Sequence, residues 1–73
     1  MIVICQNGTK EEFKTITIGG VFSNCVIGTK DGGNKYTIGK YRDAFTALTV
    51  VSKIIQHDGK RPYKMPGEDY EVK

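Results

Sequence analysis

The sequence predicts one small α+β domain, in which a small antiparallel β-meander of four to five short strands is followed by one C-terminal helix packed on the sheet. The chain has 73 residues, a length that suits a single domain. Up to about residue 40, short apolar runs alternate with glycine-containing turns, which is typical of antiparallel strands joined by tight turns. Beyond residue 40 the spacing of the apolar residues changes to that of a helix.

The first strand is expected at residues 1–5, which are β-branched and apolar on both faces. The dipeptide Asn7-Gly8 follows and is a strong signal for a hairpin turn. Gly19-Gly20 and the glycine-containing segment 29–34 are further turn signals. The remaining strands are therefore expected at residues 12–18, 22–28 and 35–39.

The helix is expected from Tyr41 to about His57, because apolar residues recur there at helical spacing. Gly59 and then Pro62 follow, in the order expected beyond the end of a helix. Threonine and valine in this segment have low helix propensity, but the period and the length favour a helix. We expect the folded domain to comprise residues 1–59 and residues 60–73 to form an extended polar tail. Tyr63 and Met65 could dock on the domain, and the chain from Glu68 onward is expected to be loose.

The helix carries more apolar surface than one sheet can cover. At 100° per residue, a first strip, expected to face the core, contains Tyr41, Ala44, Phe45, Leu48, Val51 and Ile55. A second strip contains Ala47, Val50 and Ile54, and the two strips span about 220°, against about 100° for a helix on one sheet. A helix sunk deep in the domain is one explanation, but a chain this short has few elements to cover it. We therefore expect Ala47, Val50 and Ile54 to form an interface, most simply in a homodimer.

No catalytic or metal site is expected, and no cofactor. Cys5 and Cys25 fall inside strand patterns and His57 falls at the end of the helix, with no spacing typical of zinc ligands or of a nucleophile and its base. We therefore expect a protein that is not an enzyme. No export signal precedes the cysteines, which favours buried thiols in the cytoplasm, with a Cys5–Cys25 disulfide as the alternative. No apolar run reaches the roughly 18 residues of a membrane span.

Basic residues suggest a second kind of binding. The chain has 11 Lys and Arg against 8 Asp and Glu, a net charge of +3. Three cations surround an aromatic residue after the helix, and two more flank its start, which together give a weak anion-binding site for nucleic acid or a signalling nucleotide. The simpler interpretation is a solvated surface, since acidic residues follow directly. The residues of this site are Lys40, Arg42, Lys60, Arg61, Tyr63 and Lys64.

Three segments resemble small phage and prophage proteins of Gram-positive bacteria: the opening residues 1–4, the step Tyr-Thr-Ile-Gly-Lys-Tyr at residues 36–41, and Tyr-Lys-Met-Pro at residues 63–66. In such proteins a short meander leads into a helix and a tail closes the chain. The resemblance implies an accessory protein that acts in the cytoplasm of the bacterial host. Proteins of this kind include non-catalytic inhibitors that bind and block a host macromolecule, among them anti-defence and anti-CRISPR proteins. The helix departs from the pattern, because residues 44–51 are unusually apolar.

Overall fold

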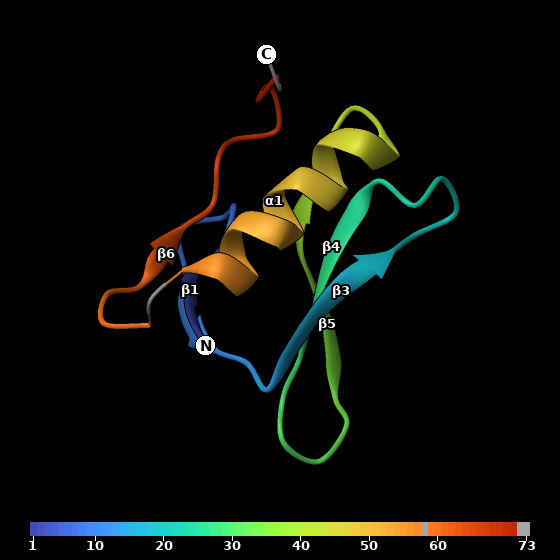
Figure 1. The fold of residues 1–73 in the computed structure, drawn as a ribbon. Coiled ribbons are helices and arrows are strands. Elements are labelled where there is room, and N and C mark those ends of the chain that lie inside the picture. The colour runs from blue at the N-terminus through green and yellow to red at the C-terminus, as the bar shows by residue number, and fades with distance from the viewer. Residues whose placement is uncertain (58, 72–73) are drawn as a thin grey trace.

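The computed structural model of the protein describes residues 1–57 and 59–71. It confirms the α+β class, with the helix after most of the strands and packed against β3 and β4 (Figure 1). The elements are β1 (Ile2–Ile4), β2 (Lys10–Glu12), β3 (Thr15–Gly19), β4 (Cys25–Thr29), β5 (Lys35–Lys40), α1 (Ala44–Gln56) and β6 (Tyr63–Lys64).

The strands form two three-stranded sheets with the orders β2-β1-β6 and β3-β4-β5. The second sheet is the expected antiparallel meander. In the first sheet β1 pairs antiparallel with β2 and parallel with β6. Gln6 joins the two sheets, because its backbone N–H donates to the Ile38 carbonyl at 3.0 Å and its side-chain Nε2 donates to the Lys40 carbonyl at 2.9 Å.

The C-terminal segment belongs to the domain, so the boundary expected at residue 59 was wrong. β6 completes the sheet of β1, with Tyr63 opposite Val3. Met65 is 5% exposed in the core, and the next carbonyl, of Pro66, accepts a hydrogen bond from the Tyr41 hydroxyl at 2.8 Å. The backbone groups on the second edge of β1 need hydrogen-bond partners, which β6 supplies. Met65 adds an apolar side chain to the core.

The expectation of a loose chain from Glu68 onward was also wrong for the residues that the structure describes. The ring of Tyr70 packs edge-on against the ring of Tyr41, with 6.4 Å between the centroids. Its hydroxyl accepts a hydrogen bond from the Lys53 ammonium at 3.0 Å. The C-terminal segment therefore runs back along α1 toward the start of the helix (Figure 1).

Two glycines let side chains approach the second sheet closely. A Cβ on Gly28 of β4 would stand 2.6 Å from the Phe13 ring, and one on Gly39 of β5 would stand 2.5 Å from the terminal methyl of Met65. Phe13 and Met65 therefore reach the sheet through gaps in its side-chain cover. The hydrophobic core lies between α1 and the two sheets and consists of Val3, Cys5, Phe13, Ile16, Val26, Ile38, Tyr41, Ala47, Val50, Val51, Ile54 and Met65.

The helix begins at Ala44, three residues later than expected, because Asp43 caps it. The Asp43 carboxylate accepts a hydrogen bond from the Thr46 N–H at 2.8 Å, which satisfies one of the free donors of the first turn. This contact is also the main reason why the pKa of Asp43 lies below its ordinary value. At the other end the His57 N–H donates to the Ile54 carbonyl.

Candidate functional site

The strip of the helix that was expected to be an interface faces the interior of its own domain. Ala47 and Val50 are 0% exposed and Ile54 is 2% exposed. The assignment of these three residues to an interface was therefore wrong. The rotation of the helix is fixed by its two ends and by the C-terminal segment, through the contacts of Tyr41 and Lys53 with Pro66 and Tyr70. The spacing of the apolar residues in the sequence does not determine this rotation.

Four residues that were expected in the core are exposed instead, namely Ala44, Phe45, Leu48 and Ile55. Phe45 is 67%, Leu48 is 55% and Ile55 is 61% exposed. We call these three residues the exposed stripe. Tyr41 and Val51, which were expected beside them, are buried. The surplus of apolar surface on the helix is therefore real, but it lies on the other side of the helix from the predicted interface.

Leu48 and Ile55 lie on the β3 side of α1, and Phe45 lies about 60–80° further around the helix, toward the outward face. The Lys53 ammonium contacts Tyr70, so the flank of the helix that carries Lys53 faces the C-terminal segment. Leu48 and Ile55 lie about 140–160° around the helix from Lys53, at 100° per residue. In Figure 1 the C-terminal segment and β3 lie on opposite sides of α1. Leu48 and Ile55 therefore face the flank on which β3 forms the edge of its sheet.

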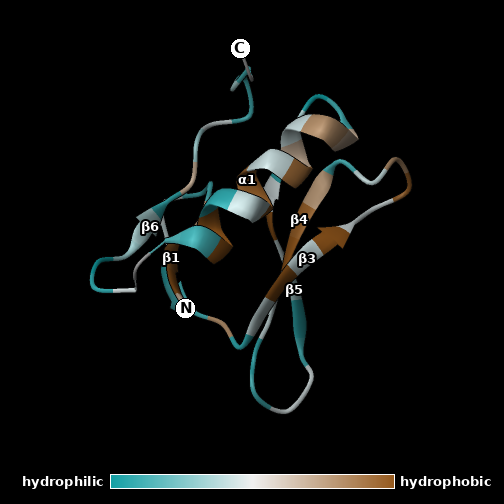
Figure 2. Ribbon diagram, viewed as in Figure 1, coloured by the Kyte–Doolittle hydropathy of each residue, from teal (hydrophilic) through white to brown (hydrophobic). Residues whose placement is uncertain are grey.

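The loop between β3 and β4 carries two more exposed apolar side chains. Val21 is 94% and Phe22 is 79% exposed, and Figure 2 shows the apolar tip of this loop. Asn24 ties the loop to the residue three positions before the helix: its side chain donates to the Tyr41 carbonyl at 2.9 Å, and its own carbonyl accepts from the Tyr41 N–H at 2.9 Å. We call the exposed stripe together with Val21 and Phe22 the apolar face.

Charged residues are absent from the segments that carry most of this face. Residues 15–29 and residues 44–52 contain no Asp, Glu, Lys or Arg, although 26% of the whole chain is charged. The first segment contains the whole of β3, an edge strand that pairs with β4 alone among residues 1–57 and 59–71. Edge strands in monomeric proteins are commonly protected by charged side chains or proline, and β3 has neither.

A cleft with a volume of about 380 Å³ lies between the two sheets. Lys30 lines this cleft, and its ammonium pairs with the Glu11 carboxylate at 2.7 Å. The ammonium also lies over the rings of Phe13 and Tyr36, 5.8 and 5.4 Å from their centroids. Cys5 also lines the cleft. Burial, and then the charge of Glu11, raise the pKa of the Cys5 thiol above its ordinary value. The thiol is therefore held in its protonated form, which is a poor nucleophile.

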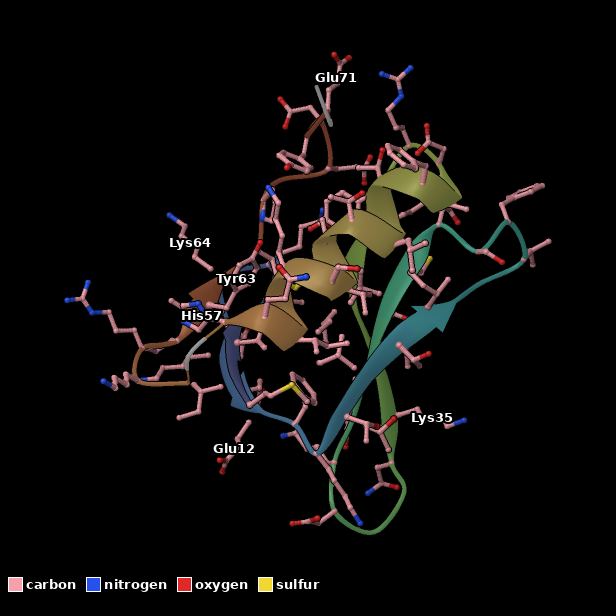
Figure 3. The ribbon with its side chains drawn as sticks, in the orientation of Figure 1. Glu12, Lys35, His57, Tyr63, Lys64 and Glu71 are labelled. Carbon is pink, nitrogen blue, oxygen red and sulfur yellow. The ribbon has the colours of Figure 1, made fainter. Side chains whose placement is uncertain are left out.

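The residues of the predicted anion-binding site do not form one patch. Lys60, Arg61 and Lys64 lie beyond the C-terminal end of α1, whereas Arg42 lies at its start, and the 13 residues of the helix span about 20 Å. Figure 3 shows Lys64 and Tyr63 at one end and Glu71 at the other. The predicted residues are apart because the length of α1 separates Arg42 from those that follow the helix.

Arg42 and Tyr63 are also engaged within the domain. The Arg42 guanidinium pairs with the Glu71 carboxylate at 2.9 Å and lies 3.8 Å from the Asp43 carboxylate. Tyr63 is half-buried, and its ring packs edge-on against the ring of His57 at 5.5 Å. Lys40 remains exposed at the end of β5, where Gln6 bonds to its backbone.

Sequence reasoning missed the apolar face, although one signal for it was present. Val21 and Phe22 follow directly after Gly19-Gly20, and large apolar residues at a turn have no core to enter. The cysteines are both free, Cys5 buried and Cys25 partly so. Within residues 1–57 and 59–71, no helix has the length and apolar character to cross a membrane. No protein-family model, curated protein or solved structure matches the chain.

Proposed function

We propose that this protein is a non-catalytic interaction protein that binds and blocks a macromolecule, and that its apolar face carries the binding. The observation that supports this is the exposure of five large apolar side chains beside a complete hydrophobic core. Scattered single apolar residues are ordinary on protein surfaces, but five large ones on the helix and on the loop that Asn24 ties to its start are typical of a protein-binding surface.

The chemistry of the apolar face suits binding to protein. Burying one large apolar side chain fully contributes about 1.5–3 kcal/mol, and the two phenylalanines are suited to anchor such a contact, because aromatic side chains bring much apolar area and few rotatable bonds. Residues 15–29 and 44–52 carry no charge, so little free energy is lost to the desolvation of ionised groups.

The resemblance to small phage and prophage proteins suggests the kind of partner. A protein that blocks a host factor needs a stable surface and no chemistry of its own. An anti-defence role, including an anti-CRISPR role, fits such a surface, with a host protein as the target.

The proposal is tested by capture from a lysate of Gram-positive bacteria with tagged protein, followed by quantitative mass spectrometry. We expect the wild type to capture a specific host macromolecule and Leu48→Lys or Ile55→Lys to reduce that capture at least about tenfold, a change of about 1.4 kcal/mol. Gln56→Lys is the matched control, because Gln56 is the exposed neighbour of Ile55 on the polar side of the helix and should leave capture unchanged. Circular dichroism checks that each variant is folded.

Two results would contradict the proposal. One is a wild type that captures nothing specific, and the other is capture that Leu48→Lys leaves intact. Binding through the apolar face should persist at about 1 M salt, where the screening length is about 3 Å. Capture that disappears at that salt concentration and requires Arg61 and Lys64 would favour the anionic-ligand alternative instead.

A further inference from the structure

We propose that the apolar face is occupied by a second copy of this chain, with β3 of each copy pairing antiparallel across a two-fold axis. The inference rests on the proposed function in one respect, namely that the apolar face binds protein. It goes further by naming the occupant and the strand that it adds to. Host binding then depends on the apolar face through the dimer that this face holds together.

The two edges of the second sheet differ, and only one is open along its length. The edge formed by β5 is engaged, because the Ile38 carbonyl accepts a hydrogen bond from the Gln6 N–H at 3.0 Å. β3, at the other edge, pairs with β4 alone within the described part of the chain. An added strand satisfies the outward backbone groups of such an edge.

The absence of charge favours a second copy over an unrelated partner. In a two-fold contact the same patch meets itself, so every charge near the axis faces its own like-charged copy. A surface that serves an oppositely charged partner would carry charges of one sign instead. β3, the loop that follows it and the first nine residues of α1 contain no ionisable Asp, Glu, Lys or Arg at all.

The register that places Thr17 on the axis brings compatible residues together. Ile16 of one copy then lies opposite Ile18 of the other, and Thr15 lies opposite Gly19. Ile16 is buried and Ile18 is half-buried on the face of the sheet toward α1, so this pairing extends the apolar layer from one copy into the next. Leu48 and Ile55, on the same flank of the helix, lie beside this junction.

The area available is close to that of a stable dimer. The five exposed side chains together present on the order of 600 Å², whereas a standard interface buries about 800 Å² on each partner. The outward side of β3 and the half-buried Ile18 supply further area. A wider contact is not needed for a chain whose whole accessible surface is 4926 Å².

The test is the molecular mass in solution, measured by sedimentation equilibrium or light scattering. We expect a dimer for the wild type at tens of micromolar. Thr17→Lys should raise the dimer dissociation constant at least about tenfold, since it places two ammonium groups opposite each other. Leu48→Lys should have a similar effect through the exposed stripe.

Thr37→Lys is the matched control for the edge. Thr17, Ile27 and Thr37 form one row across β3, β4 and β5, and Thr17 and Thr37 are both exposed. The same substitution is therefore made on the same face of the same sheet, two strands away from the open edge. We expect Thr37→Lys to remain dimeric, and hydrogen exchange of the β3 amides to slow as the wild-type concentration rises.

A wild type that stays monomeric up to about millimolar concentration would overturn the inference, as would a dimer that Thr17→Lys leaves unchanged. The failure of the inference is distinguishable from failure of the proposed function. A monomer that still captures a host macromolecule in a Leu48-dependent way refutes only the second copy. A dimer that captures nothing refutes only the role toward a host.

Discussion

The two faces of α1 show how differently the same kind of residue is used within one helix. Ile54 and Ile55 are adjacent and chemically identical, yet Ile54 is 2% exposed and Ile55 is 61% exposed. A rotation of about 100° separates them. One step along the helix therefore moves a side chain from the core to solvent. Ile54 and Ile55 should differ in their contribution to the free energy of folding by most of what the burial of an isoleucine side chain contributes.

The residues on the two faces also differ in shape. Ala47, Val50 and Val51 on the buried face are small or β-branched, whereas Phe45 and Leu48 on the exposed face are longer. Ile54 is the one long side chain on the buried face, whereas Phe45, Leu48 and Ile55 are the long apolar side chains on the exposed face. We infer that the buried face serves folding and the exposed face serves binding, and the following substitutions test that division.

The largest expected effect comes from placing a charge on each face. Val50→Asp buries an unpaired carboxylate and should destabilise the domain by about 4 kcal/mol or more, enough to unfold a small domain. Leu48→Asp places the same group in water and should change the free energy of unfolding by within about 0.5 kcal/mol. Urea denaturation followed by circular dichroism measures both, at a concentration where sedimentation shows monomer so that association does not contribute. Equal losses in the two variants would break the comparison.

A smaller and sharper effect is expected from the neighbouring isoleucines. Ile54→Ala should cost about 2–4 kcal/mol, because it removes buried methyl groups and leaves a cavity between the helix and the sheets. Ile55→Ala should cost less than about 0.5 kcal/mol in the monomer, yet it should weaken dimerisation. The pair is measured by denaturation and by sedimentation on the same samples. A stable Ile54→Ala variant would show that the helix is rotated away from the orientation described above.

The smallest expected effect concerns Tyr41, which continues the buried side just before the helix. Tyr41→Phe removes the hydrogen bond to the Pro66 carbonyl and should cost about 1 kcal/mol at neutral pH. Burial, and then the nearby Tyr63 and Tyr70, raise the pKa of Tyr41 well above its ordinary value of 10.0. The folded state then holds the phenolic proton more tightly than the unfolded state, so this contribution is complete below pH 10 and is lost as the pH rises further.

The measurement is the free energy of unfolding between about pH 8 and pH 11. The wild type should lose stability at up to about 1.4 kcal/mol per pH unit for each such group, and Tyr41→Phe should flatten the decline above pH 10. The pKa of Cys5 is also raised, so ionisation of its thiol lowers the free energy of unfolding too, beginning at a lower pH. This contribution is common to the wild type and to Tyr41→Phe. An unchanged slope in Tyr41→Phe would mean that the hydroxyl ionises equally easily in both states.

The sequence predicted elements well and contacts poorly. The change of apolar period near residue 40 located the helix, and the glycine-containing turns located β3, β4 and β5 as an antiparallel meander. Residues 63–65 were assigned to a tail, because strand pairing by two residues leaves no periodic signal and depends on the free edge of β1 far away in the chain. For the candidate site, the excess of apolar surface on the helix was predicted correctly, but it was placed on Ala47, Val50 and Ile54, the side that is buried.

The sequence by itself determined the order of the elements, the amphipathic surplus on α1 and the absence of charge in residues 15–29 and 44–52, because these are properties of local period and composition. Only the tertiary structure decided which face of α1 is buried, how the strands divide into two sheets and which edge is left open. The physical reason is that an apolar helix has several rotations of similar local energy. The choice among them is made by contacts between distant residues, such as those of Tyr41 with Pro66 and of Lys53 with Tyr70.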